Sequence, residues 1–454
     1  MNDLIQLGLF LLSIFSLTSL IIWPRIKLSW LQQVVRGIII SLPFERIPSL
    51  EIAGVSLRIS QILVLVGVWF FFILLAKNDS KITSIKIKKI NIILFSFLIA
   101  SIPSFFAVVN QTRFLTTLIA TLLAFGATFL ISQFEVNPFK RVKELTISLT
   151  LVSIFGAYQF IGDLLGIPFN FTGLREQYTK IVFGIPRIQA TALEPLYFAG
   201  MLFLPIFASL IFTSFHQRII PKIKPIPNIL TSNTSLFIFL TIIFLATYSK
   251  AAIIILVLVL ILLLIFLSFK VNTNLLIKKI TTLSLILLTI LTTIVLYIPK
   301  FKSILLTIFE FFIATILGQG VSAEERLNFL KAFYKILPQN IITGIGSGQY
   351  GPAATKYIPS LGSNITAIVN NVYLEIWLEF GLIPVLIFIG MLTYIISKNL
   401  LYLIKLPKWQ NNNEIARLIL VFSLLAYSIQ WLTFSPIFIM PIFIIIGLIT
   451  NLED

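Results

Sequence analysis

Cysteine is absent from the 454 residues, and the chain has a single histidine, His216. The protein therefore forms no disulfide, uses no thiolate nucleophile and cannot build a metal site from several histidines. No Asp-x-Asp cluster offers an acidic alternative. An enzyme with this sequence would have to work through cations, carboxylates and positioning, with no metal ion or other cofactor.

Charge is also scarce, since only 11% of the residues are charged while 58% are hydrophobic. Average soluble chains carry about 25% charged residues. A soluble fold cannot hide this much apolar surface, so the bilayer must be the solvent for most of the chain. With no internal repeat visible, residues 1–454 are expected to form one all-α integral membrane domain.

The net charge of +17 would suggest nucleic acid as the partner of a soluble protein. There is, however, no zinc-finger spacing and no basic tail, so nucleic acid is excluded. In a membrane protein, lysine and arginine instead mark the cytoplasmic loops.

Long apolar runs predict about twelve transmembrane helices of roughly 20 residues each. The predicted spans are 4–23, 61–76, 90–109, 114–131, 145–165, 193–213, 235–247, 251–268, 281–298, 372–396, 415–432 and 437–450. The first has no basic n-region or cleavage site and is expected to be retained. Residues 26–42 contain Gln32, Gln33 and Arg36 and predict an interfacial helix, followed by an extended piece at 48–60.

Five loops rich in lysine and arginine fall on one side of this topology, which predicts that both termini are cytoplasmic. The opposite side receives residues 166–192, the TYSK break at 247–250, and the only long extracytoplasmic loop, 299–371. In that loop a capping box at 322–325 opens an amphipathic helix that Pro338 ends. This helix lies flat on the membrane, covers a cavity, or is a plain surface helix.

Two cations flank apolar helices on the predicted outer side. Arg187, in GIPRIQATALEP, precedes Glu194 at a helix start; it is either a snorkelling arginine beside a capping acid or a guanidinium that binds phosphate. Lys250, in TYSKAA, either marks the turn of a helical hairpin or is a second cation for an anionic substrate. In the second case Thr247 and Ser249 would donate hydrogen bonds to that substrate. Arg326 is a third candidate cation.

Residues 344–384 form the most polar long stretch of the chain. Its GIGSGQYG turn lacks the GK[ST] ending of a P-loop and is interpreted as a tight turn. Asn370, Asn371 and Tyr373 then precede two glutamates, Glu375 and Glu379, that share one helix face. Ionisable groups near spans are costly and usually face the protein interior or a wet cavity. The stretch is therefore predicted to be one wall of a site, with a structural role as the alternative.

The order RIQATALEP, TYSKAA, GIGSGQY and NNVYLEIWLEFGLIP resembles the O-antigen polymerase and O-antigen ligase superfamily of bacterial envelope glycosyltransferases. The resemblance implies a GT-C-like fold in the bacterial cytoplasmic (inner) membrane. It also implies metal-independent transfer of glycan from an undecaprenyl pyrophosphate carrier at the outer face. Membrane lipid, a chain-length regulator and other glycan-assembly proteins are the partners it suggests.

Within this resemblance, Arg187 matches one pyrophosphate-binding arginine, and Lys250 stands in the place of a second. Asn370 stands where ligases carry a histidine, and asparagine cannot accept a proton as histidine does. The sequence therefore favours a polymerase that joins lipid-linked repeat units. Its predicted catalytic residues are Arg187, Lys250, Glu194 and Glu375, and its predicted substrate-binding residues are Arg326, Asn370, Asn371, Tyr373 and Glu379.

Three alternatives stay open at this point. The first is a ligase that transfers glycan to a lipid or protein acceptor. The second is a transporter of a small anion such as bicarbonate or of a lipid-linked glycan, which should show inverted repeats and paired broken helices. The third is a non-catalytic scaffold in an envelope complex.

Overall fold

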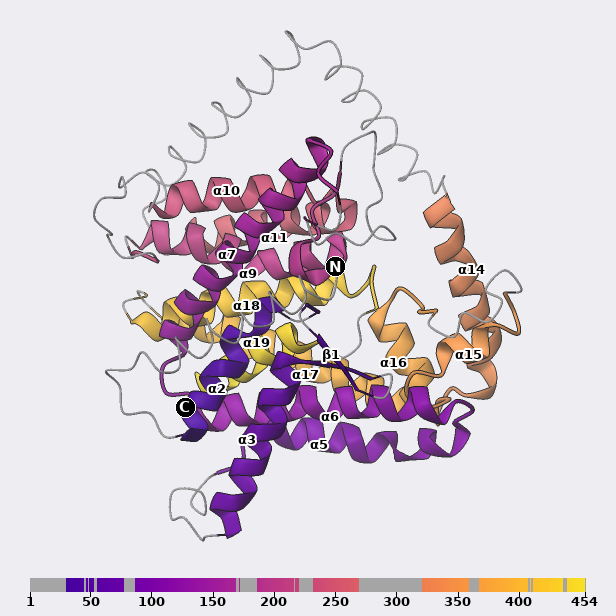
Figure 1. Ribbon diagram of the computed structural model, residues 1–454. Helices are drawn as coiled ribbons and strands as arrows, with labels where there is room; N and C mark the ends of the chain where they lie inside the picture. Colours follow the sequence, from indigo (N-terminus) through magenta and orange to yellow (C-terminus); the bar gives the residue numbers. More distant parts are fainter. Residues whose placement is uncertain are drawn as a thin grey trace.

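The computed structural model describes residues 30–44, 46–47, 49–52, 55–76, 86–168, 171, 186–215, 217–219, 232–268, 321–358, 367–406, 409, 411–435 and 439–453. The predicted spans 4–23 and 281–298, His216 and much of the predicted loop 299–371 lie outside these ranges. The described residues form an assembly of α-helices with one small β-hairpin (Figure 1).

The helices and strands occur along the chain in the following order. The first half contains α2 (Trp30–Ile40), η1 (Leu42–Phe44), β1 (Ser49–Ile52), β2 (Val55–Arg58), α3 (Ile59–Ala76), α5 (Lys89–Ser101), η2 (Ile102–Ala107), α6 (Gln111–Phe134), α7 (Pro138–Leu164), η4 (Ala190–Ala192) and α9 (Pro195–Ser214). The second half contains α10 (Asn233–Leu245), α11 (Lys250–Ser268), α14 (Val321–Ile336), η5 (Leu337–Gln339), α15 (Tyr350–Ala354), α16 (Val372–Phe380), α17 (Leu382–Lys405), α18 (Asn412–Gln430) and α19 (Met440–Asn451).

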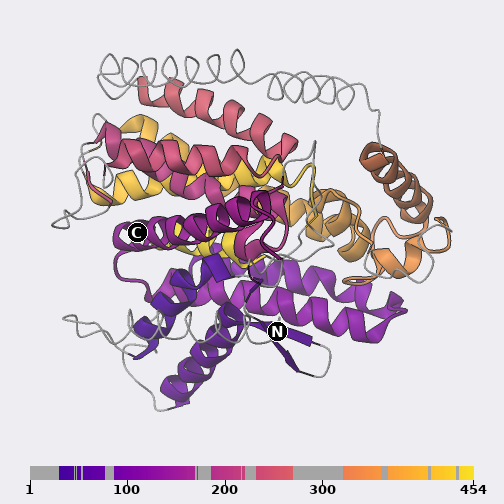
Figure 2. The same cartoon turned by 45° about the horizontal axis from the view of Figure 1, so that its top comes forward.

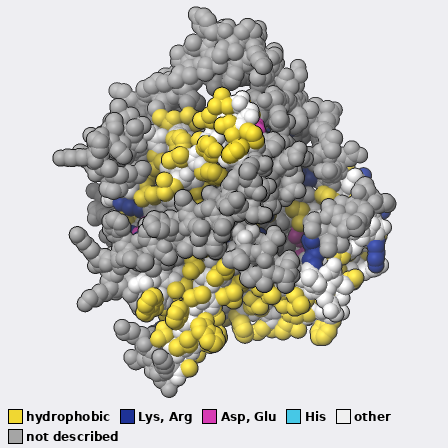
Figure 3. Space-filling model, viewed as in Figure 1, with side chains coloured by type: hydrophobic (Ala, Val, Ile, Leu, Met, Phe, Trp, Pro, Cys, Tyr) yellow, Lys and Arg dark blue, Asp and Glu magenta, His cyan; other side chains and the backbone are white. Residues whose placement is uncertain are grey.

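Seven of the described helices are long and apolar enough to cross a membrane. Those at the periphery, such as α3 and α11, turn large apolar side chains outward; Trp69, for example, is 68% exposed. Hydrophobic side chains accordingly cover much of the described surface in Figure 3. An apolar outer surface on helices of this length fits a multi-pass membrane protein.

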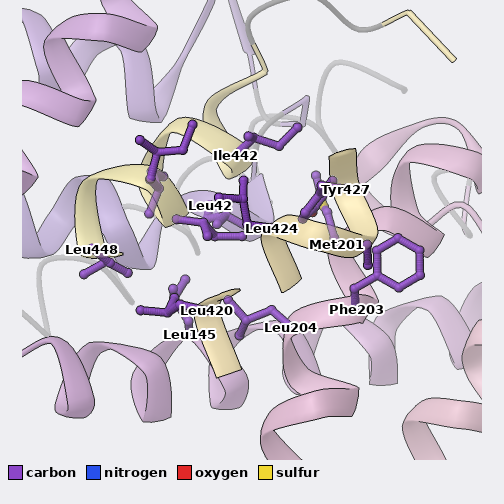
Figure 4. Packing of buried hydrophobic residues seen from close by; sticks show 14 of the residues in the cluster. Leu42, Leu145, Met201, Phe203, Leu204, Leu420, Leu424, Tyr427, Ile442 and Leu448 are labelled. Carbon is purple, nitrogen blue, oxygen red and sulfur yellow. The ribbon is translucent and has the colours of Figure 1, made fainter. Parts of the chain in front are cut away.

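Helix α9 lies at the centre of the assembly. It is apolar around its whole circumference, as a fully buried helix is expected to be, and it packs against α7, α10, α11 and α18. Phe203 of α9 packs edge-on against Tyr427 of α18 with ring centroids 5.9 Å apart, in the cluster shown in Figure 4. This rigid centre positions both ends of α9.

Helix α2 corrects one sequence prediction. Residues 26–42 were expected to form an interfacial helix, but α2 packs against α3, α6 and α7, and Val35 and Ile38 are fully buried. The reason is that Arg36, which suggested the interface, forms an ion pair with Glu144 of α7 at 2.9 Å. The predicted extended piece that follows is confirmed as the antiparallel hairpin β1–β2.

The predicted span 372–396 is also corrected, because the structure divides it at Gly381 into the short α16 and the long α17. Gly381 has φ +98° and ψ 177°, a conformation that essentially only glycine adopts. Glu375 and Glu379 therefore lie on a short helix that precedes the apolar span.

Three of the predicted basic loops meet at one end of the assembly. Lys398 pairs with Glu453 at 2.9 Å, and Lys88 interacts electrostatically with both residues. The amide of Asn451 donates to the carbonyl of Glu135 at 2.9 Å, which brings the 132–144 loop to the same end. The shared end agrees with the predicted topology, and its cytoplasmic location stays a prediction.

Candidate functional site

The RIQATALEP and TYSK motifs lie side by side. The Arg187 side chain donates from Nε to the carbonyl of Thr247 at 3.0 Å, and the Ile188 N–H donates to the carbonyl of Ala246 at 3.1 Å. These bonds fix the Arg187 guanidinium at the break between α10 and α11. The hydroxyl of Thr247, predicted to be a substrate donor, donates to the carbonyl of Phe244 at 2.7 Å, and its role toward a substrate stays a prediction.

Glu194 is the carboxylate of this region. It is the N-cap residue of α9, but its side chain makes no capping hydrogen bond. It also forms no ion pair within 4 Å among the described residues, although Arg46, Arg187 and Arg326 all interact with it electrostatically. Burial raises the pKa of Glu194 above that of an ordinary glutamate, against the opposing effect of the three arginines.

Lys250 completes a cluster of charges, because it interacts electrostatically with Arg187 and Arg326. We call Arg46, Arg187, Lys250, Arg326 and Glu194 the cation cluster. Three arginines act on Glu194, and Lys250 interacts with two of those arginines. Positive charge is therefore in excess, which favours a bound anion. The sequence predicted four of these five residues as site residues, and the structure brings those four together; their catalytic roles stay predictions.

The cation cluster lies at the end of the assembly away from the basic loops. Gln430, at the end of α18, donates to the carbonyl of Leu196 in the first turn of α9 at 3.0 Å. Arg417, near the start of α18, bonds to Asn399 at 2.7 Å, close to the Lys398–Glu453 pair. The 19 residues of α18 therefore separate the two ends, a length of about 28 Å.

Unusual backbone conformations mark the predicted motifs. Among the described residues, four that are not glycine have positive φ: Ala190 at 46°, Leu193 at 59°, Tyr248 at 49° and Asn370 at 63°. The first two lie in RIQATALEP, the third in TYSK and the fourth before NVYLE. Such conformations cost about 1–3 kcal/mol each and cluster at functional sites. Their positions support a functional role for these three loops.

Arg46 and Tyr197 were not identified from the sequence. The Arg46 guanidinium carbon lies 3.8 Å from the centroid of the Tyr197 ring, which itself contacts Phe434 with ring centroids 4.3 Å apart. The hydroxyl of Thr191 donates to the carbonyl of Pro43 and ties the η1 loop to η4. No periodic pattern surrounds Arg46, so only this tertiary contact reveals it.

The glycine-rich turn binds a carboxylate of the chain itself. Gly344, Gly346 and Gly348 all have positive φ, which confirms the prediction of a tight turn. The N–H groups of Gly348 and Tyr350 donate to the two carboxylate oxygens of Glu379, at 2.8 and 3.2 Å. The anion-binding geometry of this turn is therefore satisfied internally.

The same turn is joined to the corner between α5 and α6. Gln349 accepts from the N–H groups of Val109 and Asn110, at 3.1 and 2.8 Å, and donates to the carbonyl of Asn110. Arg113 donates to the carbonyl of Gly348. Figures 1 and 2 show the resulting arrangement, with α15 and α16 beside this corner and α14 outside them.

Glu375 and Glu379 are 5% and 1% exposed. Burial raises the pKa of Glu379 to about 7, while the N–H groups of Gly348 and Tyr350 and the charge of Arg113 oppose the shift. Burial and then repulsion from Glu379 raise the pKa of Glu375, whose carboxylate accepts from the Val369 N–H at 3.0 Å. Both glutamates are thus held by the backbone.

The residues before α16 are also engaged within the protein. Asn371 caps α16 by accepting from the Leu374 N–H at 3.1 Å, and its amide donates to the carbonyl of Leu432 at 3.2 Å. The Tyr373 hydroxyl donates to the carbonyl of Ser428 at 2.8 Å. Asn370 adopts the left-handed backbone, and its substrate-binding role, like those of its neighbours, stays a prediction.

The two parts of the predicted site are neighbours. The Val372 N–H donates to the carbonyl of Trp431 at 3.0 Å, while Phe434, three residues further along that loop, contacts Tyr197. Tyr197 also interacts electrostatically with Glu375 and Glu194. The 431–435 loop therefore connects the wall around α16 with the cation cluster. Within the described ranges, no three histidine, cysteine or acidic side chains gather to hold a metal ion.

Together, the long apolar helices indicate a multi-pass membrane protein, and the cation cluster lies at one end of it. Residues 235–389, less than half of the 454-residue chain, match the family model described as O-Antigen ligase. This match supports the resemblance of the chain to the O-antigen ligase and polymerase superfamily, and it indicates glycan ligation or polymerisation as the general class of reaction. A comparison with curated proteins gives no match.

Proposed function

We propose that the protein polymerises lipid-linked oligosaccharide repeat units at the outer face of the bacterial cytoplasmic membrane. The donor would be a glycan on undecaprenyl pyrophosphate, and no metal ion would take part. The single observation that carries this proposal is the cation cluster, where Arg187 and Arg326 act on Glu194 and Lys250 interacts with both arginines. The family match supports glycan transfer as the reaction class.

Arg187 and Lys250 would bind the pyrophosphate. A guanidinium presents a planar fork that suits phosphate oxygens, and the Nε bond to Thr247 leaves its terminal nitrogens for the substrate. Positive charge held in place in a poorly solvated site stabilises the negative charge that develops on the leaving pyrophosphate. Arg326, exposed on α14, would help to hold the donor from the side of the loop.

Glu194 would be the general base. Its raised pKa brings it closer to neutral pH, and its side chain makes no capping hydrogen bond to α9 that would have to be broken. Glu375 suits the role less, because it is 5% exposed and bound to the Val369 N–H. Asn370 cannot accept the proton.

The reaction follows from this arrangement. An acceptor hydroxyl oxygen attacks the anomeric carbon of the donor sugar in line with the bond to the pyrophosphate. The new glycosidic bond forms as the bond between the anomeric carbon and the pyrophosphate oxygen breaks. The hydroxyl proton passes to Glu194, and undecaprenyl pyrophosphate leaves with the bonding electron pair.

The experiment replaces Arg187 by alanine in the native host and analyses the lipid-linked oligosaccharides. We expect single repeat units to accumulate on the carrier and surface polymer to disappear. The exposed Arg218, at the other end of α9, serves as a matched control whose replacement should change nothing. Unchanged polymer length and amount in Arg187→Ala, at normal protein level, would contradict the proposal.

The description of the matching family favours one second candidate, ligation of a finished glycan to a lipid or protein acceptor. The same experiment separates the two reactions. A ligase defect would accumulate full-length chains on the carrier, whereas a polymerase defect accumulates single units.

A further inference from the structure

Arg46 reaches the cation cluster from a part of the chain far from the family match at residues 235–389. It lies between η1 and β1, and its guanidinium covers the ring of Tyr197 in the first turn of α9. Glu194 and Tyr197 are three residues apart at the start of that helix and so share one face. Arg46 therefore lies over the same helix turn that presents the proposed base.

Arg46 is half-buried and forms no close ion pair with another described residue. Its Nε is buried without a hydrogen-bond partner, and no carboxylate lies within ion-pair distance. Its interactions are the contact with the Tyr197 ring and the longer-range attraction of Glu194. A buried N–H group is normally hydrogen-bonded, so the unsatisfied Nε indicates that Arg46 can accept a further partner. The N–H groups of a guanidinium lie in its plane. A guanidinium that stacks on a ring can therefore still donate hydrogen bonds at its edges.

The position of Arg46 is well defined. The Tyr197 ring is held by α9 on one side and by Phe434 on the other. The Pro43 carbonyl, three residues before Arg46, accepts from the hydroxyl of Thr191 in η4. The segment that carries Arg46 is thus tied to the segment between Arg187 and Glu194, and its guanidinium is fixed before a ligand arrives.

We propose that Arg46 is a substrate-binding residue that contacts the second phosphate of the pyrophosphate carrier, and that Tyr197 positions its guanidinium. The inference rests on the proposed function and adds a third segment of the chain to the site. A lipid monophosphate needs only one of the two phosphate contacts, whereas a lipid pyrophosphate uses both. Arg46 would therefore contribute to the preference for pyrophosphate over monophosphate.

The test measures binding of undecaprenyl pyrophosphate and undecaprenyl monophosphate to the full-length protein in lipid nanodiscs. Loss of a charge-assisted contact should weaken pyrophosphate binding by about tenfold or more in Arg46→Ala. Monophosphate binding should change much less. Arg46→Lys keeps the charge but loses the forked guanidinium, so its affinity for pyrophosphate should lie between those of the unchanged protein and Arg46→Ala. Tyr197→Phe keeps the ring and should bind normally, whereas Tyr197→Leu should behave like Arg46→Ala.

Two results would overturn the inference: equal loss for both lipids, or no loss for either. Arg187→Ala then separates the inference from the proposed function. If Arg187→Ala weakens binding and Arg46→Ala does not, only the role of Arg46 is refuted. If neither change matters, the proposed function fails as well. Should Arg46→Ala fail to fold, Arg46→Lys decides alone, because an unchanged lipid preference in that variant refutes the contact.

Discussion

A β-carbon at Gly381 should detach the 341–350 segment from α16. The ideal position of that carbon lies 2.1 Å from the carbonyl oxygen of Ile342, and its nearest neighbours are backbone atoms that no rotamer change can move. The backbone itself, at φ +98°, is unfavourable for alanine. We therefore expect Gly381→Ala to separate the two segments.

The magnitude follows from the bonds that would break. Three backbone hydrogen bonds join the segment to α16 and its end: Leu382 N–H to Ile341 at 3.0 Å, Ile345 N–H to Leu378 at 2.9 Å and Gly346 N–H to Glu379 at 2.9 Å. At about 1 kcal/mol each, with about 1–3 kcal/mol of backbone strain, the cost is about 5 kcal/mol. That is comparable to the whole stability of a small domain, about 5–15 kcal/mol.

The absence of cysteine makes the assay direct, since a single introduced thiol is the only one present. Ala332 of α14 is 1% exposed and packs in a small core with Tyr350 and Leu378. A cysteine at this position should resist a maleimide reagent in the otherwise unchanged protein and react rapidly when Gly381→Ala is added. A cysteine in place of the exposed Lys331 should react in both backgrounds.

The matched control is Gly390→Ala in the middle of α17. A β-carbon there meets no atom within 4 Å, and alanine favours a helix by about 1 kcal/mol relative to glycine. This change should leave the cysteine at position 332 protected. If that cysteine stays equally protected in Gly381→Ala, the account of the 341–350 segment is refuted.

Three further predictions concern buried or strained positions. The raised pKa of Glu379 means that its protonation stabilises the fold below pH 4.5 and that this contribution, on the order of 3 kcal/mol, is lost as the pH rises through about 7. Thermal unfolding of Glu379→Gln should lack that decline, and parallel pH profiles would contradict the prediction. Arg141 pairs with Glu135 at 3.0 Å, and the Glu135 side chain is only 3% exposed. Arg141→Met would leave that buried carboxylate without its cation, which should cost about 3–5 kcal/mol of stability and lower the Tm. Asn370→His should leave Tm almost unchanged because histidine tolerates the left-handed backbone, whereas Asn370→Val should lower it.

Most helices could be predicted because apolar runs of membrane length leave few alternatives. The helix expected from the capping box at 322–325 is present as α14 and ends before Pro338, where η5 begins. The break at Gly381 between α16 and α17 could not be predicted in the same way. Gly381 stands between two runs that would each continue a helix, and only docking of the 341–350 segment selects its backbone conformation.

Some residues of the candidate site could be predicted from the sequence, and others could not. Glu194 and Lys250 could be found because each stands at the start of an apolar helix, and Arg187 because it is a charge in a short segment before one. Arg46 could not, because it lies in a short loop without periodicity and approaches α9 only through the Tyr197 and Thr191 contacts. For Glu379, spacing indicated a shared helix face, but the two N–H groups that bind its carboxylate come from a distant turn.

The hydrogen bonds between Gln349 and the corner after α5 have a consequence for the biosynthesis of the protein. They join Gln349 to Val109, 240 residues earlier in the chain. Several membrane helices must be synthesised and inserted between the two halves of this contact. Until Gln349 emerges, the corner after α5 lacks its partner and Arg113 has no Gly348 carbonyl to bind. Maturation at this end of the molecule is therefore a late event, and nascent chains that stop before residue 349 should be open there to proteases and quality control.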